Sequence, residues 1–343
     1  MNKTTRWAVL VASLAASGFA CTSCARHGPP AFLRLPPGIS AAFTEDELKT
    51  NRKFQAVFCS VLGERDSTSE NWESCNQYVE MPQALPGEEP PKLSTDFTLL
   101  SVGGFGAECF SPTVEVFKDA LEHLQSIHGV TYYHIPVHAF GSTEHNAEII
   151  RDTVKALSEK RFIAVAHSKG AADFMYALSN FPSELKRVEA LITVAGAVGG
   201  SWLADDFVKL QDTMLRGLKM KGCPQDTPSP QNALNSMRRD RRQEFLASAT
   251  RNWNGYSISA VSRKERTSDV LLPLWNAVAP HAVEQDSHIV EREAIVPGGR
   301  FLGRALGDHW AVAMPFTPND KITGVGRDFV NEHVEWNRFP RVA

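Results

Sequence analysis

From Phe97 onward, short continuous runs of hydrophobic residues alternate with amphipathic segments that have helical spacing. This alternation predicts strands joined by helices. Short apolar runs typical of buried strands occupy 97–102, 130–137, 162–166, 190–195 and 256–261. Amphipathic segments beginning at Pro112 and spanning 146–157 read as helices between them. Strands and helices that alternate in this order predict parallel strands joined by right-handed crossovers. We therefore expect an α/β fold with a mostly parallel sheet flanked by helices.

The stretch 161–178, RFIAVAHSKGAADFMYAL, predicts a strand, a sharp turn and a helix. In such a turn the middle residue, Ser168, is forced outward. Small residues two positions before and after it, Ala166 and Gly170, let the strand and the helix approach closely. This is the G-x-S-x-G nucleophile elbow with alanine in the first position. The alternative is a serine that only caps the helix. In a nucleophile elbow, the Ser168 hydroxyl lies beside the unpaired backbone amides at the start of the helix, which favour negative charge.

The first of these strands ends in a glycine-rich loop, Gly103-Gly104-Phe105-Gly106. Glycines let the backbone turn and bring its amides close to a bound group. We expect an oxyanion hole formed by the backbone N–H of Phe105, or of Gly104, together with that of Lys169. A nucleotide-phosphate loop is disfavoured, because no Lys-Ser/Thr pair follows the glycines.

A nucleophilic serine needs an imidazole that takes its proton. Four histidines follow Ser168 in the chain, and they are His281, His288, His309 and His333. We assign the base to His309, which follows Gly307 in a short segment typical of a loop. His281 and His288 are the alternatives, and His333 falls within a predicted surface helix. His167 is adjacent to the nucleophile, but its side chain should point away from that of Ser168.

The imidazole in turn needs a carboxylate on its far nitrogen, which fixes its tautomer and stabilises the cation. Asp286 precedes a short apolar run and would lie in a turn after one of the later strands of the sheet, so we assign the acid to it. Asp269 is the second choice. Asp308 is too close to His309 along the chain to reach its far nitrogen easily.

These segments together resemble the α/β-hydrolase superfamily, near bacterial lipases and esterases. The resemblance rests on the loop at Phe105, the elbow at Ser168, the Gly199-Gly200-Ser201 and Ala204-Asp205 stretch, Asp286, and Asp308-His309. It covers roughly Phe97 to the end of the chain. It implies hydrolysis of acyl esters through an acyl-serine intermediate, without a metal or an organic cofactor. Two departures are Ala166 in place of the first elbow glycine and Ser287 where the family often has glycine.

Composition places few limits on the protein's partners. The formal net charge is −3, with 22% charged residues, which gives no reason to expect nucleic acid. One basic cluster, Arg238-Arg239-Asp240-Arg241-Arg242, is interpreted as a solvated helix face. The alternative is a role with anionic ligands or membrane headgroups.

The beginning of the chain predicts export. Lys3 and Arg6 precede the apolar stretch 7–20, which is too short to span a bilayer comfortably, so 1–20 is interpreted as a signal peptide. Cys21 is the expected lipidated cysteine of a bacterial envelope lipoprotein, and a proline-rich tether, 21–40, follows it. Simple cleavage after Ala20 and secretion is the alternative.

Export makes disulfides possible among the remaining cysteines, Cys59, Cys75, Cys109 and Cys223. Cys59 with Cys75 closes a short loop and is favoured, and Cys109 with Cys223 then follows by elimination. No spacing resembles paired C-x-x-C units, so no metal site is expected.

The predicted organisation is an N-terminal appendage at 41–95 and a catalytic domain at 96–343. Within that domain, residues 203 to about 253 show no strand pattern, which predicts a helical cap or lid. The predicted function is an exported serine hydrolase of carboxylic esters, with lipid or acyl esters as substrates. An acyltransferase or polyester depolymerase with the same residues is one alternative. The other is a non-catalytic envelope protein that binds lipid and retains the fold.

Overall fold

The structure is a computed structural model of the chain. It describes residues 53–54, 56–58, 79–80, 93–110, 115–159, 161–208, 223–224, 228–249, 252–260, 294–305, 309 and 312–314. All of these residues belong to one compact unit, 45–343. The predicted signal peptide, the tether and most of the predicted appendage lie outside the described residues, as do Cys59 and Cys75.

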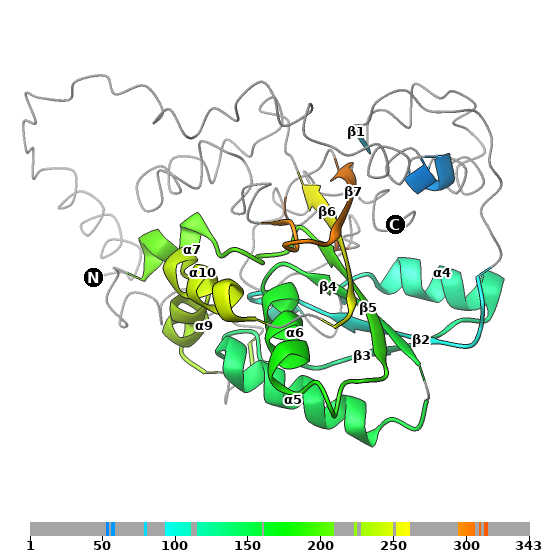
Figure 1. Ribbon diagram of the computed structural model, residues 1–343, viewed down its shortest axis with the longest axis horizontal. Coiled ribbons are helices and arrows are strands. Elements are labelled where there is room, and N and C mark those ends of the chain that lie inside the picture. The colour runs from blue at the N-terminus through cyan, green and yellow to red at the C-terminus, as the bar shows by residue number, and fades with distance from the viewer. Residues whose placement is uncertain are drawn as a thin grey trace, which may run out of the picture. The chain divides into compact units, whose positions relative to one another are not determined.

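The centre of this unit is a seven-stranded sheet with the strand order β1-β7-β6-β5-β4-β2-β3 among the described residues (Figure 1). Strands β2 to β7 pair in parallel, whereas β1 pairs antiparallel with β7 at one edge. The strands are β1 (Val79–Glu80), β2 (Thr98–Val102), β3 (Thr131–His134), β4 (Phe162–His167), β5 (Val188–Val194), β6 (Asn254–Ala260) and β7 (Arg300–Ala305). The expected α/β architecture, a mostly parallel sheet flanked by helices, is thus confirmed.

Apolar side chains fill a core on each face of the sheet, because successive residues of a strand point to opposite faces. Leu99 packs in one core, with residues of α4 (Lys118–His128). Its neighbour Leu100 packs in the other core, with residues of α5 (Thr143–Ala156) and α6 (Lys169–Asn180). Helices α5 and α6 also pack against each other along this face (Figure 1). All five residues of β2 are buried, which explains its continuous apolar pattern.

Helix α4 begins at Lys118, later than the start predicted at Pro112. Phe117 has φ 61°, a left-handed conformation that no helix interior accommodates, and its N–H donates to the carbonyl of Ala313 at 2.9 Å. The helix ends as the sequence predicts, because Gly129 adopts φ 68° and caps it.

Among the described residues, three helices follow β5 in the region where the sequence predicts a cap. They are α7 (Trp202–Phe207), α9 (Pro230–Ser236) and α10 (Arg239–Ser248), and they contact one another (Figure 1). Arg238 has an extended backbone, with ψ 140°, and separates α9 from α10. A covering or mobile role for these helices stays a prediction.

Candidate active site

Ser168 occupies the tight turn between β4 and α6, as the nucleophile-elbow pattern predicts. Its backbone has φ 55° and ψ −126°, a conformation that a non-glycine residue rarely adopts. Two interactions hold the turn in place. The Ser168 N–H donates to the carbonyl of Val194 at 3.2 Å, and the Ser168 carbonyl accepts from the N–H of Ala197 at 2.9 Å. The neighbouring strand β5 and its loop therefore fix a strained serine at the carboxyl edge of the sheet.

Two glycines allow the loop after β2 to lie against this turn. A Cβ atom on Gly104 would come within 2.4 Å of the Ser168 Cβ and 2.9 Å of its Oγ. A Cβ atom on Gly170 would come within 2.5 Å of the carbonyl oxygen of Gly103. Gly170 therefore serves the approach of α6 to the loop at 103–106, whereas the sequence argument assigned it to packing of α6 against its own strand.

Among the described histidines, His309 contacts the Ser168 hydroxyl. Its Nε2 lies 2.7 Å from the Ser168 Oγ, and both residues are buried, at 5% and 6% exposure. The distance is that of a hydrogen bond, the geometry in which an imidazole can accept a hydroxyl proton. Burial keeps water from competing for either atom.

His167 holds the backbone of His309 in this position. The Nε2 of His167 lies 2.7 Å from the His309 carbonyl oxygen, and the two rings are 4.7 Å apart. A carbonyl only accepts hydrogen bonds, so the His167 Nε2 carries the proton and donates. The side chain of His167 thus contacts the base rather than the nucleophile. The sequence predicts that this side chain turns away from Ser168 but does not reveal its contact with His309.

Of the two predicted oxyanion donors, Lys169 is next to the nucleophile along the chain and Phe105 is near it in space. Lys169 is the first residue of α6, and Phe105 follows Gly104, which abuts Ser168. Neither the N–H of Lys169 nor that of Phe105 donates to another described residue. Both amides therefore have a free donor for a ligand oxygen, as far as the described part of the chain shows. The Phe105 ring packs 4.8 Å from that of Phe140.

The predicted acid, Asp286, lies outside the described residues, as do Asp269, Asp308, His281, His288 and His333. The structure therefore brings together Ser168, His309 and the loop at Phe105, and the carboxylate that orients His309 stays a prediction. Among the described residues no three His, Cys, Asp or Glu side chains are grouped so as to hold a metal ion.

A buried ion pair beside the nucleophile was not found from the sequence. The Nζ of Lys169 lies 2.7 Å from both carboxylate oxygens of Asp173, and both residues are 1% exposed. Asn146 donates to the same carboxylate at 2.7 Å. Burial raises the pKa of Asp173 and lowers the pKa of Lys169, while their mutual attraction acts in the opposite direction. A signal was available, because Lys169 and Asp173 are four residues apart within an otherwise apolar helix.

The interpretation of the basic cluster as a solvated face is wrong for Arg242, which is 2% exposed. Its Nε donates to the carbonyl of Val198 at 2.9 Å, and its guanidinium lies 4.6 Å from the centre of the Phe245 ring. Arg239 is half-buried, stacks over Trp202 at 3.2 Å and pairs with Asp205 at 2.6 Å. Cation–π contacts and these acceptors explain why arginines face inward here.

The expected disulfide between Cys109 and Cys223 is present. Cys109 belongs to η2 (Ala107–Phe110), directly after the glycine-rich loop, and Cys223 lies between α7 and α9. The bond therefore ties the loop that carries Phe105 to the helical region after β5.

The chain is similar to solved structures of several hydrolases. The chain is 28% identical to a metagenomic carboxyl esterase, MGS0156, with a TM-score of 0.70 over 85% of this chain and 88% of that one. It also matches the mature lipase BlEst2 from Bacillus licheniformis, at 17% identity and a TM-score of 0.48 over 71% and 91%. A third match is an extracellular α/β-hydrolase from a Paenibacillus species, at 14% identity and a TM-score of 0.36 over 70% and 98%. No protein-family profile matches the chain, and no curated protein matches its sequence.

A parallel sheet with a strained serine after a central strand and a histidine in contact with it defines a hydrolase-like α/β protein. The likeness to the carboxyl esterase, in fold and in 28% of aligned residues, supports a relationship of this chain to the α/β-hydrolase superfamily.

Proposed function

We propose that the protein is an exported serine hydrolase that cleaves carboxylic esters through an acyl-serine intermediate. The observation that carries the proposal is the 2.7 Å contact between the Ser168 Oγ, on a strained elbow, and the His309 Nε2. A serine is a weak nucleophile unless an adjacent base takes its proton, and this pair supplies both parts. The likeness to a carboxyl esterase supports an ester as the bond that is cleaved.

In the proposed reaction, the Ser168 Oγ attacks the ester carbonyl carbon while its proton moves to the Nε2 of His309. The carbonyl oxygen becomes an oxyanion that accepts hydrogen bonds from the N–H groups of Phe105 and Lys169. His309 then returns the proton to the departing alkoxide, which leaves as the alcohol, and the acyl group remains on Ser168. Water, deprotonated by His309, attacks the acyl carbonyl carbon. The bond to the Ser168 Oγ then breaks while His309 returns the proton to that oxygen, which releases the carboxylic acid and restores the free serine. Asp286 is the proposed partner of the far nitrogen of His309.

The surroundings of the elbow favour an apolar acyl group. A buried cluster contains Ala172, one turn into α6, and Ala197, whose N–H binds the Ser168 carbonyl. Phe105 packs against the same cluster, as does Leu203. The helical region completes it with Phe207, Leu234 and Met237. Because this apolar cluster adjoins the elbow through Ala172 and Ala197, a hydrocarbon acyl group is the proposed substrate part at this site.

A series of nitrophenyl esters from acetate to palmitate tests the proposal. We expect hydrolysis by the wild type and none above background by Ser168→Ala. The matched control is Ser126→Ala, which removes an exposed serine hydroxyl from α4 and should hydrolyse at the wild-type rate. The proposal fails if Ser168→Ala retains the wild-type rate. A folded wild type without turnover favours the non-catalytic lipid-binding alternative.

The proposed location is the bacterial cell envelope, with Cys21 as the lipidated anchor, or the secreted medium. The Cys109–Cys223 disulfide supports an oxidising compartment, because such bonds form and persist outside the reducing cytosol. No helix among the described residues is long and apolar enough to cross a bilayer. Metabolic labelling with a palmitate analogue should modify the wild type but not Cys21→Ser. Labelling of both proteins, or of neither, contradicts the lipidation.

A further inference from the structure

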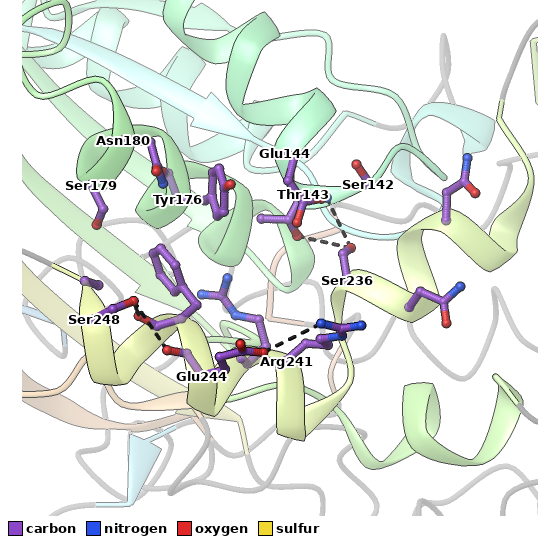
Figure 2. Close-up of a pocket in the computed structure, with 15 residues that line it drawn as sticks. Ser142, Thr143, Glu144, Tyr176, Ser179, Asn180, Ser236, Arg241, Glu244 and Ser248 are labelled. Atoms are coloured by element: carbon purple, nitrogen blue, oxygen red, sulfur yellow. Dashed lines mark hydrogen bonds and ion pairs between the residues drawn. The ribbon is translucent and has the colours of Figure 1, made fainter.

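A cleft lies between the helix pair α5 and α6 and the helix pair α9 and α10 (Figure 2). Its volume is about 840 Å³, and neither Ser168 nor His309 lines it. In Figure 2, Thr143 on α5 and Tyr176 on α6 face Ser236 and Arg241 on the other pair. The cleft is separate from the candidate active site, because it lies along α6 toward its C-terminal end, whereas Ser168 precedes the helix.

Arg242 lines this cleft and brings a charge that its neighbours do not balance. Its Nη2 is buried and has no hydrogen-bond partner among the described residues. The nearby carboxylate of Asp173 is already held by Lys169 and Asn146. Lys169, Asp173 and Arg242 are all buried and together carry a net positive charge. The Val198 carbonyl and the Phe245 ring contact the guanidinium but carry no net charge, so the buried positive charge favours an anion that binds the free Nη2.

The guanidinium stays charged in neutral water. Burial lowers the pKa of Arg242 to about 10, while Asp173 and Glu144 act in the opposite direction. Glu144 lines the cleft but is exposed to solvent, which screens its charge. Glu244 also lines the cleft, and it lies 3.6 Å from the exposed Arg241. The two carboxylates therefore leave the buried charge of Arg242 largely uncompensated.

The N-terminus of α5 opens into the same cleft. This helix has 14 residues, and its first turn, with the cap residue Ser142 and Thr143, lines the cavity. The Glu144 N–H donates to no other described residue, whereas the N–H of Thr143 donates to Ser236 at 3.1 Å. A helix N-terminus carries partial positive charge and free N–H groups, which favour an oxyanion.

We propose that this cleft binds a small polar molecule through a carboxylate or phosphate group held by Arg242 and the N-terminus of α5. The rest of the lining suits such a ligand. Tyr176, Asn232, Asn235 and Ser236 present hydroxyl and amide groups, which hydrogen-bond to the polar body of the molecule. The site is independent of turnover at Ser168.

Titration calorimetry of the full chain with sodium phosphate and with sodium acetate, at constant ionic strength, tests the proposal. We expect saturable binding of at least one anion with one site per chain. Ser168→Ala should bind as the wild type does, which separates this site from the proposed catalytic function. Absence of saturable binding of both anions to the folded wild type overturns the proposal.

Two exposed positions offer a matched pair of variants. Asn235→Asp places a negative charge in the cleft, whereas Gln243→Glu places one on α10 outside the cleft. We expect Asn235→Asp to weaken anion binding about tenfold or more and Gln243→Glu to leave it unchanged. Arg242→Met should abolish anion binding if that variant folds. If it does not fold, the comparison of Asn235→Asp with Gln243→Glu decides whether the anion binds in the cleft. Equal weakening by both exposed variants shows a general charge effect and refutes the site.

A phosphate ligand could be free or part of a lipid headgroup. Calorimetry with glycerol 3-phosphate measures the free form. Co-sedimentation with phosphatidylglycerol vesicles measures the lipid form, with phosphatidylcholine vesicles as the control. Loss of either interaction in Asn235→Asp but not in Gln243→Glu supports the site and identifies the source. Retention of both interactions in Asn235→Asp refutes it.

Discussion

Replacing Gly104 by alanine inserts a methyl group between the glycine-rich loop and the proposed nucleophile. The added Cβ would lie 2.4 Å from the Ser168 Cβ, whereas ordinary contact begins at 3.4 Å, so the two must separate by about 1 Å. The Ser168 Oγ lies 2.7 Å from the His309 Nε2. A displacement of about 1 Å takes the hydroxyl out of hydrogen-bond range or misdirects it. A misplacement of about 1 Å can cost on the order of 100-fold in rate, and that is the fall in kcat/KM that we expect.

Steady-state hydrolysis of nitrophenyl butyrate, with thermal unfolding measured in parallel, provides the assay. Overpacking costs about 1–3 kcal/mol of stability, so the variant should fold but melt earlier. The control is Gly255→Ala, whose Cβ would lie 2.8 Å from Val296 at the opposite end of the parallel strands. It should lose comparable stability and keep its kcat/KM. An unchanged kcat/KM in folded Gly104→Ala would refute the contact between the loop and the nucleophile.

Three further predictions concern stability. Asp173→Asn leaves the Lys169 ammonium buried without its counter-charge and should lower the free energy of unfolding in urea by about 3–5 kcal/mol; an unchanged midpoint would contradict this. Replacing Cys109 and Cys223 by serine removes a disulfide between residues 114 positions apart and should lower the free energy of unfolding by about 2–5 kcal/mol. Equal melting temperatures of the oxidised wild type and the double variant would contradict the presence of this bond. Burial lowers the pKa of His134 below its ordinary 6.5, so the unfolded chain binds more protons and stability is lost as pH falls through that value. His134→Gln should lose less stability than the wild type between neutral pH and pH 5, and equal losses would show that another group is responsible.

The sequence predicted the elements on which the site depends because their patterns are strong and local. The apolar run before Ser168 and the helical spacing after it locate β4 and α6 within a residue or two of their observed bounds. The loop of glycines at the end of β2 was recognisable for the same reason.

Strand β7 was missed because its pattern does not resemble a buried strand. Its sequence, RFLGRA, contains two arginines and a glycine. The glycine, Gly303, has φ 158° and lies where the pairing with β6 is irregular. Its place in the sheet depends on contacts with β6 that are distant in the sequence.

The buried polar network was equally hidden, because burial is a property of the assembled helices. Arg242 looks like a surface residue among other arginines, and only the packing of α10 against the loop at Val198 buries it. From four histidines the sequence favours His309 as the base, but no local pattern shows that it reaches Ser168. The contact between His309 and Ser168 joins residues 141 positions apart.

Peptide-resolved mass spectrometry of the full chain after reaction with a fluorophosphonate identifies the activated serine, since this reagent captures such a residue covalently. We expect a single adduct on Ser168 in the wild type and labelling slower by orders of magnitude in His309→Ala. An adduct on another residue, or equal labelling rates for the two proteins, would contradict the proposed pairing of Ser168 with His309.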